Sequence, residues 1–502
     1  MQSPILLVSK PDEPARTNCA CASSQLYRSR SETGAHARCE NDCACGAGQS
    51  LKMARGTTPS VLQALPWLHR MHLDDDHELW FDPFGDSNVI VANRSARRIL
   101  DAFTTPASPR SVFPAGRDGA DLLVEQLIGL GLLRAPDMPR PQLRPVNARL
   151  TAWLHVTNAC NLRCTYCYIH KSREAMDEPT GRAAVDAVFR SALAQGFAEV
   201  ELKYAGGEAT LNFALVRTLH EHALALAAEH GLGLREVVLS NGLAISAENL
   251  DFLREGRITL MISLDGLGES HDAQRPLRNG RGSSAFVQRT IRRAVAAGVY
   301  PHLSITVTAQ NVPSLPETVS FAIELGLRFN LNLYRDHGCV ASAEKLRSDE
   351  AHLIDGLRAA LATLERELPD YRLIDGMLDR SSFQAPHATG CGVGHNYLVI
   401  DQRGGVAACQ MEIENTITHI DEPDPLRVLQ TADFGFRNLP AAEKEGCRDC
   451  TWQWWCAGGC SLLTKRVTGR DDVKSPYCNV YKAIYPDVLR LEGLRLLKTR
   501  GE

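Results

Sequence analysis

The sequence predicts an α/β protein whose centre is a parallel β-sheet that closes, or nearly closes, into a barrel. Three observations support this prediction. Residues 150 to about 337 alternate short apolar runs with amphipathic stretches, which is the pattern of repeated strand–helix units. A smaller α+β pattern precedes them at 59–145, and seven of the sixteen cysteines follow them, from Cys391 to Cys478. At 502 residues the chain is long enough for two or three domains.

Residues 1–58 are rich in Ser, Arg, Gly and Ala and have no sustained apolar period, so we expect this segment to be disordered. Met53 offers an alternative start that would remove it. The segment carries five cysteines: Cys19, Cys21, Cys39, Cys43 and Cys45. Their wide spacing defines no site by itself, and extra metal ligation is the alternative interpretation.

Residues 59–145 have the pattern of a small α+β domain that ends in a linker. Two strands, Glu78–Phe81 and Asn88–Val91, flank a Gly-Asp-Ser turn. Ser95 is placed to cap the helix that follows. A second helix is expected over Asp121–Leu133, with four apolar residues on one stripe: Leu122, Leu123, Leu127 and Ile128. The proline-rich stretch from residue 135 has the composition of a linker.

The barrel is expected over residues 146–340, followed by a helical bridge at 341–384 that includes Asp349–Leu368, and by a cysteine-rich unit at 385–502. The six expected barrel strands are Ala152–Thr157, Glu199–Tyr204, Glu236–Ser240, Thr259–Leu264, His302–Thr308 and Arg328–Tyr334. Amphipathic segments such as Ala183–Ala194 and Phe213–Glu229 separate them. Functional groups of such a barrel gather at the C-terminal ends of its strands, and several polar or glycine-rich segments fall at those ends.

The bulk composition narrows the partners and the compartment. The net charge of -4 gives no reason to expect a nucleic acid partner. No apolar run reaches the about 18 residues of a membrane-spanning helix, and the N-terminus lacks a charged segment followed by an apolar one. We therefore expect a cytoplasmic protein without a membrane partner. In that compartment sixteen cysteines indicate metal or redox chemistry rather than disulfides.

The first cysteine cluster directly follows the first barrel strand. Cys160, Cys164 and Cys167 form a Cys-x3-Cys-x2-Cys motif. Three thiolates can hold a [4Fe-4S] cluster and leave its fourth iron open to another ligand. A structural zinc site is the alternative, but it would need a fourth ligand, and no fourth ligand is nearby in the sequence.

The nine residues from Cys160 to Tyr168, Cys-Asn-Leu-Arg-Cys-Thr-Tyr-Cys-Tyr, resemble the signature of the radical S-adenosylmethionine (SAM) enzymes. The resemblance implies a partial (β/α)6 TIM-like barrel over residues 146–340. It also implies that SAM chelates the open iron and is cleaved reductively to a 5′-deoxyadenosyl radical, which abstracts hydrogen from a carbon. The protein residues implied to contact SAM are Tyr166, Gly206, Gly207, Glu208, Asn241, Ser263 and Arg275.

The roles of these residues follow from the same resemblance. The backbone of the Gly-Gly-Glu element at 206–208 would hold the SAM amino group, although Ala209 stands where relatives commonly have proline. Ser263 and Arg275 would contact the carboxylate, and Asn241 would lie near the ribose. Tyr166 would pack beside the adenine. Asp265, at a strand end, is a weak candidate for a general base.

The downstream cysteines resemble the SPASM extension of this superfamily, which houses two auxiliary [4Fe-4S] clusters. By resemblance one cluster, called here the outer cluster, is bound by Cys447, Cys450, Cys456 and Cys478. The inner cluster is bound by Cys391, Cys409 and Cys460. Its fourth ligand in some relatives falls at Ala385, so His387, His395 or Cys339 would replace it, or an open iron would bind substrate sulfur. Two zinc knuckles are the alternative that the spacing alone allows.

Residues 59–133 resemble the small winged-helix domain with which maturases of ribosomally made peptides recognise their substrates. Such a domain would capture a leader peptide as an added β-strand. The alternative is a structural cap on the barrel.

We therefore expect a radical SAM enzyme that matures a peptide or protein, with three [4Fe-4S] clusters and a reducing donor such as flavodoxin or ferredoxin. A thioether crosslink is the leading product. Carbon–carbon crosslinking and quinone-cofactor (amine dehydrogenase) maturation are alternatives, as is formylglycine formation in sulfatases. Sulfatase-maturing relatives carry an aspartate base where this chain has Gln410, which cannot accept a proton at neutral pH. A non-enzymatic electron-transfer scaffold is a third class, against which the intact motifs argue.

Overall fold

The computed structural model describes most of the chain from residue 60 onward and one short segment before it. The described residues are 6–9, 60–85, 89–113, 120–141, 143, 148–243, 245–336, 343–374, 376–379, 381, 383 and 385–500. Met53, Cys339 and the five N-terminal cysteines lie outside them, as do residues 86–88 of the predicted turn and strand.

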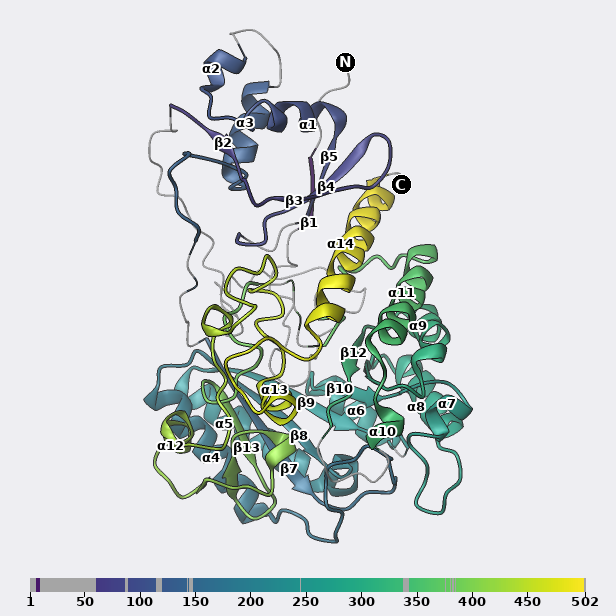
Figure 1. Ribbon diagram of the computed structural model, residues 1–502. Helices are drawn as coiled ribbons and strands as arrows, with labels where there is room; N and C mark the ends of the chain where they lie inside the picture. Colours follow the sequence, from purple (N-terminus) through teal and green to yellow (C-terminus); the bar gives the residue numbers. More distant parts are fainter. Residues whose placement is uncertain are drawn as a thin grey trace.

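The centre of the molecule is a nine-stranded sheet with the order β12-β11-β10-β9-β8-β7-β13-β14-β15 (Figure 1). Its first six members pair in parallel with their neighbours and confirm the six predicted barrel strands. They are β7 (Arg149–Thr157), β8 (Glu199–Gly206), β9 (Gly233–Ser240), β10 (Thr259–Ser263), β11 (His302–Val307) and β12 (Phe329–Leu333). All nine residues of β7 are buried. The sheet ends at β12 rather than closing, so the barrel is partial.

Helices connect the parallel strands and cover the outside of the sheet (Figure 1). They are α4 (Glu178–Ala194), α5 (Phe213–His230), α6 (Ala247–Glu255), α7 (Glu269–Asp272), α8 (Ser284–Ala296) and α9 (Leu315–Glu324), with the short 3-10 helices η1 (Ala209–Asn212) and η2 (Val312–Ser314). Then follow α10 (Ala343–Leu346) and α11 (Glu350–Arg366), the predicted bridge. The Asp177 side chain caps α4 by accepting from the Thr180 N–H at 2.9 Å, and Asp349 caps α11 in the same way.

The cysteine-rich unit is continuous with the barrel rather than separate from it. Strand β13 (Tyr397–Ile400) pairs in parallel with β7, from Tyr397↔Thr151 to Ile400↔Leu154. Antiparallel β14 (Gly405–Ala407) and β15 (Thr418–His419) extend the sheet. The remaining elements are η3 (Gln410–Glu412), α12 (Pro425–Thr431), η4 (Ala441–Glu443), α13 (Ser461–Thr468) and α14 (Cys478–Arg500). The domain boundary predicted at residue 385 therefore divides one sheet between two units.

The N-terminal unit is a four-stranded antiparallel sheet with the order β1-β5-β4-β3, covered by helices. Its elements are β1 (Leu6–Ser9), β3 (His69–His72), β4 (His77–Phe81), β5 (Val89–Asn93), α1 (Arg94–Asp101), α2 (Pro109–Val112) and α3 (Ala120–Gly129), with the small pair β2 (Gln63–Ala64) and β6 (Leu133–Arg134). The prediction of disorder is wrong for residues 6–9, because β1 pairs with the edge of β5. The α+β character and both predicted strands are confirmed.

Three details of the predicted helices in this unit are wrong. The cap of α1 is Asn93, whose Oδ1 accepts from the Ala96 N–H at 3.0 Å, whereas Ser95 lies inside the helix. The helix α3 ends at Gly129 instead of residue 133, because the chain there turns into β6. Leu122 is 62% exposed and does not belong to the buried stripe, which Leu123 and Leu127 form with neighbouring residues.

Helix α14 links the cysteine-rich unit to the N-terminal sheet (Figure 1). It begins at Cys478, and near its end the fully buried Glu492 accepts hydrogen bonds from the Ser9 hydroxyl and from the Leu373 N–H at 3.1 Å. The Trp455 indole also donates to the Pro83 carbonyl at 2.9 Å. Through these buried groups, the C-terminal part of the chain contacts β1, the loop after β4 and the segment that follows α11.

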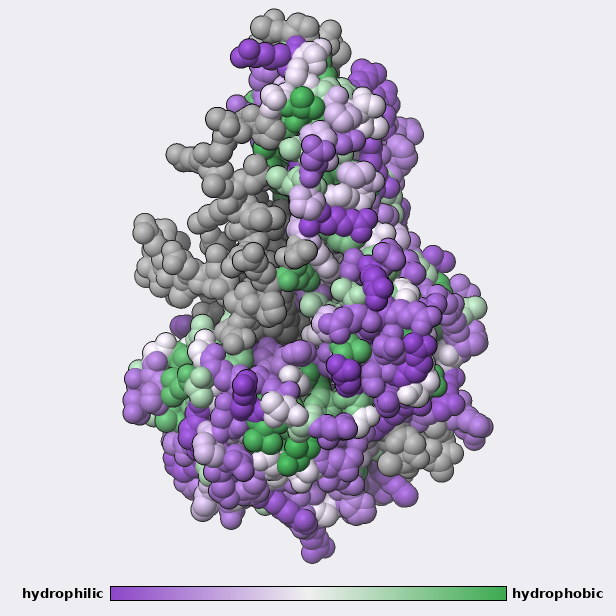
Figure 2. Space-filling view, turned by 60° about the vertical axis from the view of Figure 1, so that its left-hand side comes forward, coloured by the Kyte–Doolittle hydropathy of each residue, from purple (hydrophilic) through white to green (hydrophobic). Residues whose placement is uncertain are grey.

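Among the coloured residues in Figure 2, hydrophilic side chains predominate and the hydrophobic ones form small groups. Within the described part of the chain no helix combines the length and apolar character needed to cross a membrane.

Candidate functional site

The three cysteines of the first cluster lie on the loop that follows β7. Cys160 is buried, and Cys164 and Cys167 are half-buried. Burial raises the pKa of Cys160, and it raises the pKa of Cys164 to about 11, with the neighbouring thiols adding to both shifts. The three thiols are thus close enough to repel one another when ionised. Coordination to a metal centre is the means by which such buried thiols lose their protons.

The cysteine loop is fixed to the segment that follows β10. The Arg163 N–H donates to the Pro276 carbonyl at 2.9 Å, and the Thr165 N–H donates to the Gln274 carbonyl at 2.9 Å. Lys171 donates to the Leu162 carbonyl at 2.9 Å and holds the loop from its other side. No motif in the sequence singles out Lys171.

Asp265, Tyr166 and Arg275 form a buried network that supports this attachment. The Tyr166 hydroxyl donates to Asp265 and accepts from the Arg275 guanidinium, which lies 3.5 Å from the same carboxylate. The other Asp265 oxygen accepts from the Thr306 N–H at 2.9 Å. Burial raises the pKa of Tyr166 well above its ordinary value, against the opposing effect of Arg275.

These contacts assign Asp265 a different task from the predicted general base. Its side chain is fully buried and each carboxylate oxygen accepts a hydrogen bond from a protein group, so a substrate proton could reach it only by displacing these partners. Asp265 instead positions Tyr166, inside the cysteine motif, and Arg275. A single sequence contains no signal for this role, because the partners are 99 and 10 residues away.

The Gly-Gly-Glu element lies directly against the start of the cysteine loop. A Cβ at Gly206 would lie 2.3 Å from the Thr157 carbonyl oxygen, and one at Gly207 would lie 2.4 Å from that of Ala159. The Gly207 N–H already donates to Thr157 at 2.7 Å. Only glycine therefore allows the two loops to approach this closely.

Glu208 and Asn241 hold neighbouring strand ends together. Burial raises the pKa of Glu208, whose carboxylate accepts from the Ser240 hydroxyl at 2.8 Å and from the Asn241 N–H at 2.7 Å. The Asn241 side-chain amide donates to Asn161 Oδ1 at 2.6 Å, within the cysteine loop. Ser263 is the last residue of β10, as expected for a strand-end residue. All seven predicted SAM contacts thus come from the C-terminal ends of β7, β8, β9 and β10 or the loops that follow.

The four outer-cluster cysteines form a second group. The thiols of Cys450 and Cys478 contribute to the pKa shifts of Cys447 and Cys456, so the four lie near one another. Burial is the main cause of these shifts, and it raises the pKa of Cys447 to about 11 and that of Cys456 to about 12.

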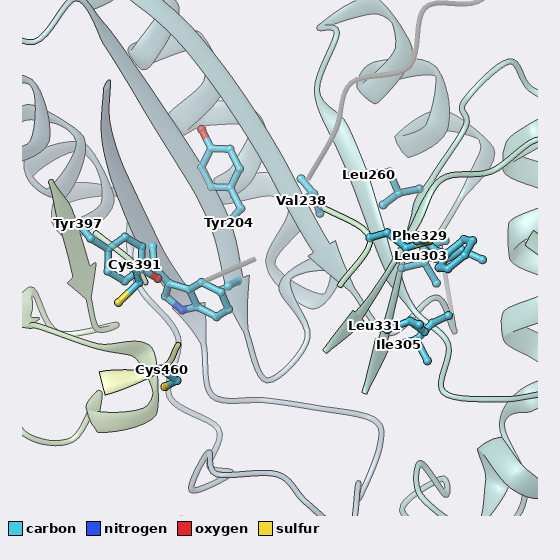
Figure 3. Packing of buried hydrophobic residues seen from close by; sticks show 14 of the residues in the cluster. Tyr204, Val238, Leu260, Leu303, Ile305, Phe329, Leu331, Cys391, Tyr397 and Cys460 are labelled. Atoms are coloured by element: carbon cyan, nitrogen blue, oxygen red, sulfur yellow. The ribbon is translucent and has the colours of Figure 1, made fainter. Parts of the chain in front are cut away.

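The inner-cluster cysteines lie at the edge of this group, near β13. A Cβ at Gly390 would lie 2.0 Å from the Gly459 carbonyl oxygen, so the loops of Cys391 and Cys460 are in direct contact. Asn438 donates to the Cys391 carbonyl at 2.7 Å and accepts from the Ser461 hydroxyl at 2.8 Å, which joins the two loops again. Figure 3 shows Cys391 beside Tyr397 of β13, with Cys460 nearby.

Three polar side chains beside the inner cysteines, those of His387, His395 and Gln410, each have a hydrogen-bond partner within the protein. A ring nitrogen of His387 lies 3.3 Å from the Ala385 carbonyl, and one of His395 lies 3.4 Å from that of Asn438. The buried Gln410 amide oxygen accepts from the Tyr397 hydroxyl at 3.1 Å.

All ten described cysteines are free of disulfides. Nowhere in the described ranges do three His, Cys, Asp or Glu side chains converge on a point suited to one metal ion.

Parts of the chain, including the barrel that carries these residues, are similar to known proteins. Residues 154–322 match the family model described as the radical SAM superfamily. Over 289 residues the chain is 25% identical to the sporulation killing factor maturation protein SkfB of Bacillus subtilis, which covers 56% of this chain and 66% of that protein. It is 21% identical over 359 residues to a cysteine-type anaerobic sulfatase-maturating enzyme of Clostridium perfringens, covering 66% and 93%. The chain spans 55%, 59% and 66% of the lengths of three curated relatives.

Among solved structures, native anSMEcpe with bound AdoMet and Cp18Cys peptide superimposes with a TM-score of 0.55 at 18% identity. The match covers 68% of this chain and 99% of that one. This likeness shows a shared fold, and it confirms the predicted partial-barrel α/β class.

Replacing Asp265 with asparagine tests the anchoring network. Removing one partner of a buried ion pair typically costs about 3–5 kcal/mol, so Asp265→Asn is expected to lower the free energy of unfolding strongly and to reduce the iron bound after reconstitution. Asp251→Asn, which breaks the exposed 2.8 Å pair with Arg254, is the matched control. A surface pair is worth about 1 kcal/mol or less. Equal effects of the two variants in urea unfolding and iron analysis would contradict the anchoring role.

The buried His271 beside this network predicts sensitivity to acid. Its Nδ1 accepts from the Asp265 N–H at 3.2 Å and its Nε2 lies 3.0 Å from the Ser283 hydroxyl, so the neutral ring is bonded on both sides. Burial, with a smaller effect of Arg275, lowers the pKa of His271 to about 3. The folded pKa is below the unfolded one, so the stabilisation is complete above about pH 6.5 and is lost as the pH falls.

Between pH 7 and pH 5 this histidine is expected to remove about 2 kcal/mol from the free energy of unfolding. Urea unfolding of the wild type and of His271→Gln at both pH values measures the effect. The variant keeps an acceptor and a donor but cannot titrate, so it should lose less stability over the same interval. An identical loss in both proteins would show that His271 is not the cause.

Proposed function

Because residues 154–322 form a radical SAM domain, we propose that this protein matures a ribosomally made peptide by forming a sulfur-to-carbon thioether. The observation that carries the proposal is the pairing of β13 with β7. It attaches the segment that runs from Cys391 to Cys409 to the strand that precedes the first cysteine loop. A substrate held at the ends of the barrel strands would lie between the site of radical formation and groups able to take up an electron.

The site fits the cofactors of this family. In a radical SAM domain, a [4Fe-4S] cluster and SAM together supply a 5′-deoxyadenosyl radical that removes hydrogen from a carbon. Cys160, Cys164 and Cys167 would hold the cluster on a loop that backbone hydrogen bonds keep in place.

The residues proposed to hold SAM offer suitable donors and acceptors. The Arg275 Nε is buried and has no hydrogen-bond partner among the residues that the structure describes, and the SAM carboxylate would supply one. Ser263 would donate to the same carboxylate. The N–H groups of Gly207 and Glu208 are already bonded, which leaves carbonyl oxygens of this element to accept from the SAM amino group.

The adenosine part of SAM would lie against the same strand ends. Tyr166, fixed by Asp265 and Arg275, would pack beside the adenine. Asn241 would approach the ribose from the strand end that Glu208 holds.

The seven downstream cysteines would hold two auxiliary clusters, for a total of three. Cys447, Cys450, Cys456 and Cys478 have the mutual proximity that one cube requires. Cys391, Cys409 and Cys460 would hold the second, with His387 or His395 as candidates for the fourth ligand. The buried, joined loops of Cys391 and Cys460 support this assignment.

Among the products, a thioether has more support than formylglycine. The similarity to SkfB, a maturation protein of the sporulation killing factor, supports a peptide substrate. The similarity to a sulfatase-maturating enzyme keeps formylglycine formation as the alternative. However, Gln410 donates and accepts hydrogen bonds but cannot serve as a base, and its buried oxygen is already bonded to Tyr397. Carbon–carbon crosslinking and quinone-cofactor maturation would use the same core.

The N-terminal unit would recognise the leader peptide of the substrate by strand addition. The edge of β5 accepts an antiparallel strand, because Leu6–Ser9 of the chain itself pairs there from Leu6↔Ala92 to Ser9↔Val89. A leader peptide would displace β1 and form the same backbone hydrogen bonds. A flavodoxin or ferredoxin would supply the electron.

The activity is tested with anaerobically reconstituted protein, SAM, dithionite and the peptides encoded by small neighbouring reading frames. We expect 5′-deoxyadenosine together with a peptide that loses about 2 Da, the mass of two hydrogens, and one thiol that can no longer be alkylated. Cys160→Ala should give neither product. The same mass loss with all thiols still alkylatable would indicate a carbon–carbon bond, and an aldehyde at a cysteine position would indicate formylglycine. Either result would contradict the thioether.

Leader recognition is tested by deleting residues 1–10. Removal of a strand that competes for the β5 edge should strengthen binding of the leader peptide several-fold in fluorescence anisotropy. A peptide of the same composition in scrambled order is the control for non-specific binding. Unchanged leader affinity after the deletion would show that the leader does not bind at this edge.

A further inference from the structure

Lys444 is a buried lysine beside the downstream cysteines. It follows η4, and its side chain is 0% exposed. Its Nζ has no hydrogen-bond partner within the described part of the chain. Lys203, which is equally buried, differs because its Nζ lies 3.6 Å from the Glu201 carboxylate. An unpaired ammonium in a protein interior is strongly unfavourable, so a compensating group is expected beside it.

The surroundings of Lys444 are made of cysteines from both downstream groups. Its electrostatic neighbours are Cys447 and Cys456 of the outer group and Cys391 and Cys460 of the inner group. The side chain therefore lies between the two groups. Each neighbour becomes a negatively charged sulfur when it binds iron.

The backbone is built to leave room for this lysine. A Cβ at Gly458 would lie 2.8 Å from the Lys444 Nζ and 2.7 Å from its Cδ, and Gly458 has a φ of +78°. Gly458 belongs to the Cys456–Cys460 turn, which supplies one cysteine to each group. Any side chain at this position would meet the lysine and would also strain the backbone.

We propose that Lys444 is a positioning residue shared by the two auxiliary clusters, donating to their sulfur atoms and stabilising their reduced form. This inference rests on the proposed function, because it requires both clusters. A positive charge and hydrogen bonds near a cluster favour the reduced state, which carries one more negative charge.

In this role Lys444 affects the fate of the electron that thioether formation releases. The hydrogen atom of the substrate carbon goes to 5′-deoxyadenosine, the thiol proton goes to a base or solvent, and the new S–C bond leaves one electron. That electron passes to the auxiliary clusters and leaves through the redox partner. Lys444 increases the tendency of the clusters to accept it.

The test uses the full chain with Cys160, Cys164 and Cys167 all replaced by alanine, so that only the auxiliary clusters remain. Lys444→Met removes charge and donor, and Lys444→Gln removes only the charge. Lys482→Met is the matched control, because Lys482 is an exposed lysine near Cys478 whose charge is screened by solvent. Iron per chain is measured first, and the reduction potentials follow from anaerobic titrations read by electron paramagnetic resonance.

We expect about eight irons per chain in the background protein, four for each of two clusters. Lys444→Met and Lys444→Gln should shift at least one auxiliary potential to more negative values, and Lys482→Met should not. Unchanged potentials at full iron loading, or an equal shift in Lys482→Met, would overturn the role of Lys444 and leave the proposed function intact. If Lys444→Met binds less iron than the background protein, the reduction potentials of Lys444→Gln are compared with those of the background protein instead. A background protein without iron would overturn the auxiliary clusters themselves.

Discussion

The parallel pairing of β13 with β7 is the constraint on which both cysteine regions depend. β7 ends where the loop of Cys160 begins, and β13 lies between Cys391 and Cys409 in the sequence. Four buried residue pairs fix the register, and a slip of one residue would move every side chain of β13 to the opposite face. The relation between the first cysteine loop and the downstream cysteines is therefore set by a buried sheet rather than by a linker. Helix α14 extends this frame from Cys478 to β1 and β5.

Buried charged side chains lie beside both the first cysteine loop and the downstream cysteines. Asp265, Tyr166 and Arg275 lie beneath the cysteine loop, and Lys444 lies between the downstream cysteine groups. Apolar residues of the same size would often be as stable or more stable at such positions, so stability alone does not account for them. In each place one nitrogen, Arg275 Nε or Lys444 Nζ, has no partner in the described ranges. A carboxylate beside the first and cluster sulfur beside the second would complete both networks.

The sequence was most informative for features that depend on the spacing of neighbouring residues in the chain. The six barrel strands follow from alternating apolar runs, and the ten described cysteines from their motifs, because both depend on near neighbours in the chain. Contacts between distant residues were not readable in this way. The pairing of Tyr397 with Thr151 joins residues 246 apart, and the role of Asp265 depends on Tyr166, 99 residues away. At α1 the predicted cap was Ser95, but β5 runs directly into the helix, so that Asn93 caps it and Ser95 lies inside.

The central claim is that the strand ends of this barrel generate a radical that acts on a peptide carbon. The most direct measurement is deuterium transfer from a precursor peptide, labelled at its α- and β-carbons, to 5′-deoxyadenosine, read by mass spectrometry. The account predicts that the nucleoside gains one deuterium, that the gain requires Cys160, Cys164 and Cys167, and that the peptide becomes crosslinked. Unlabelled 5′-deoxyadenosine formed alongside an unchanged peptide would contradict it.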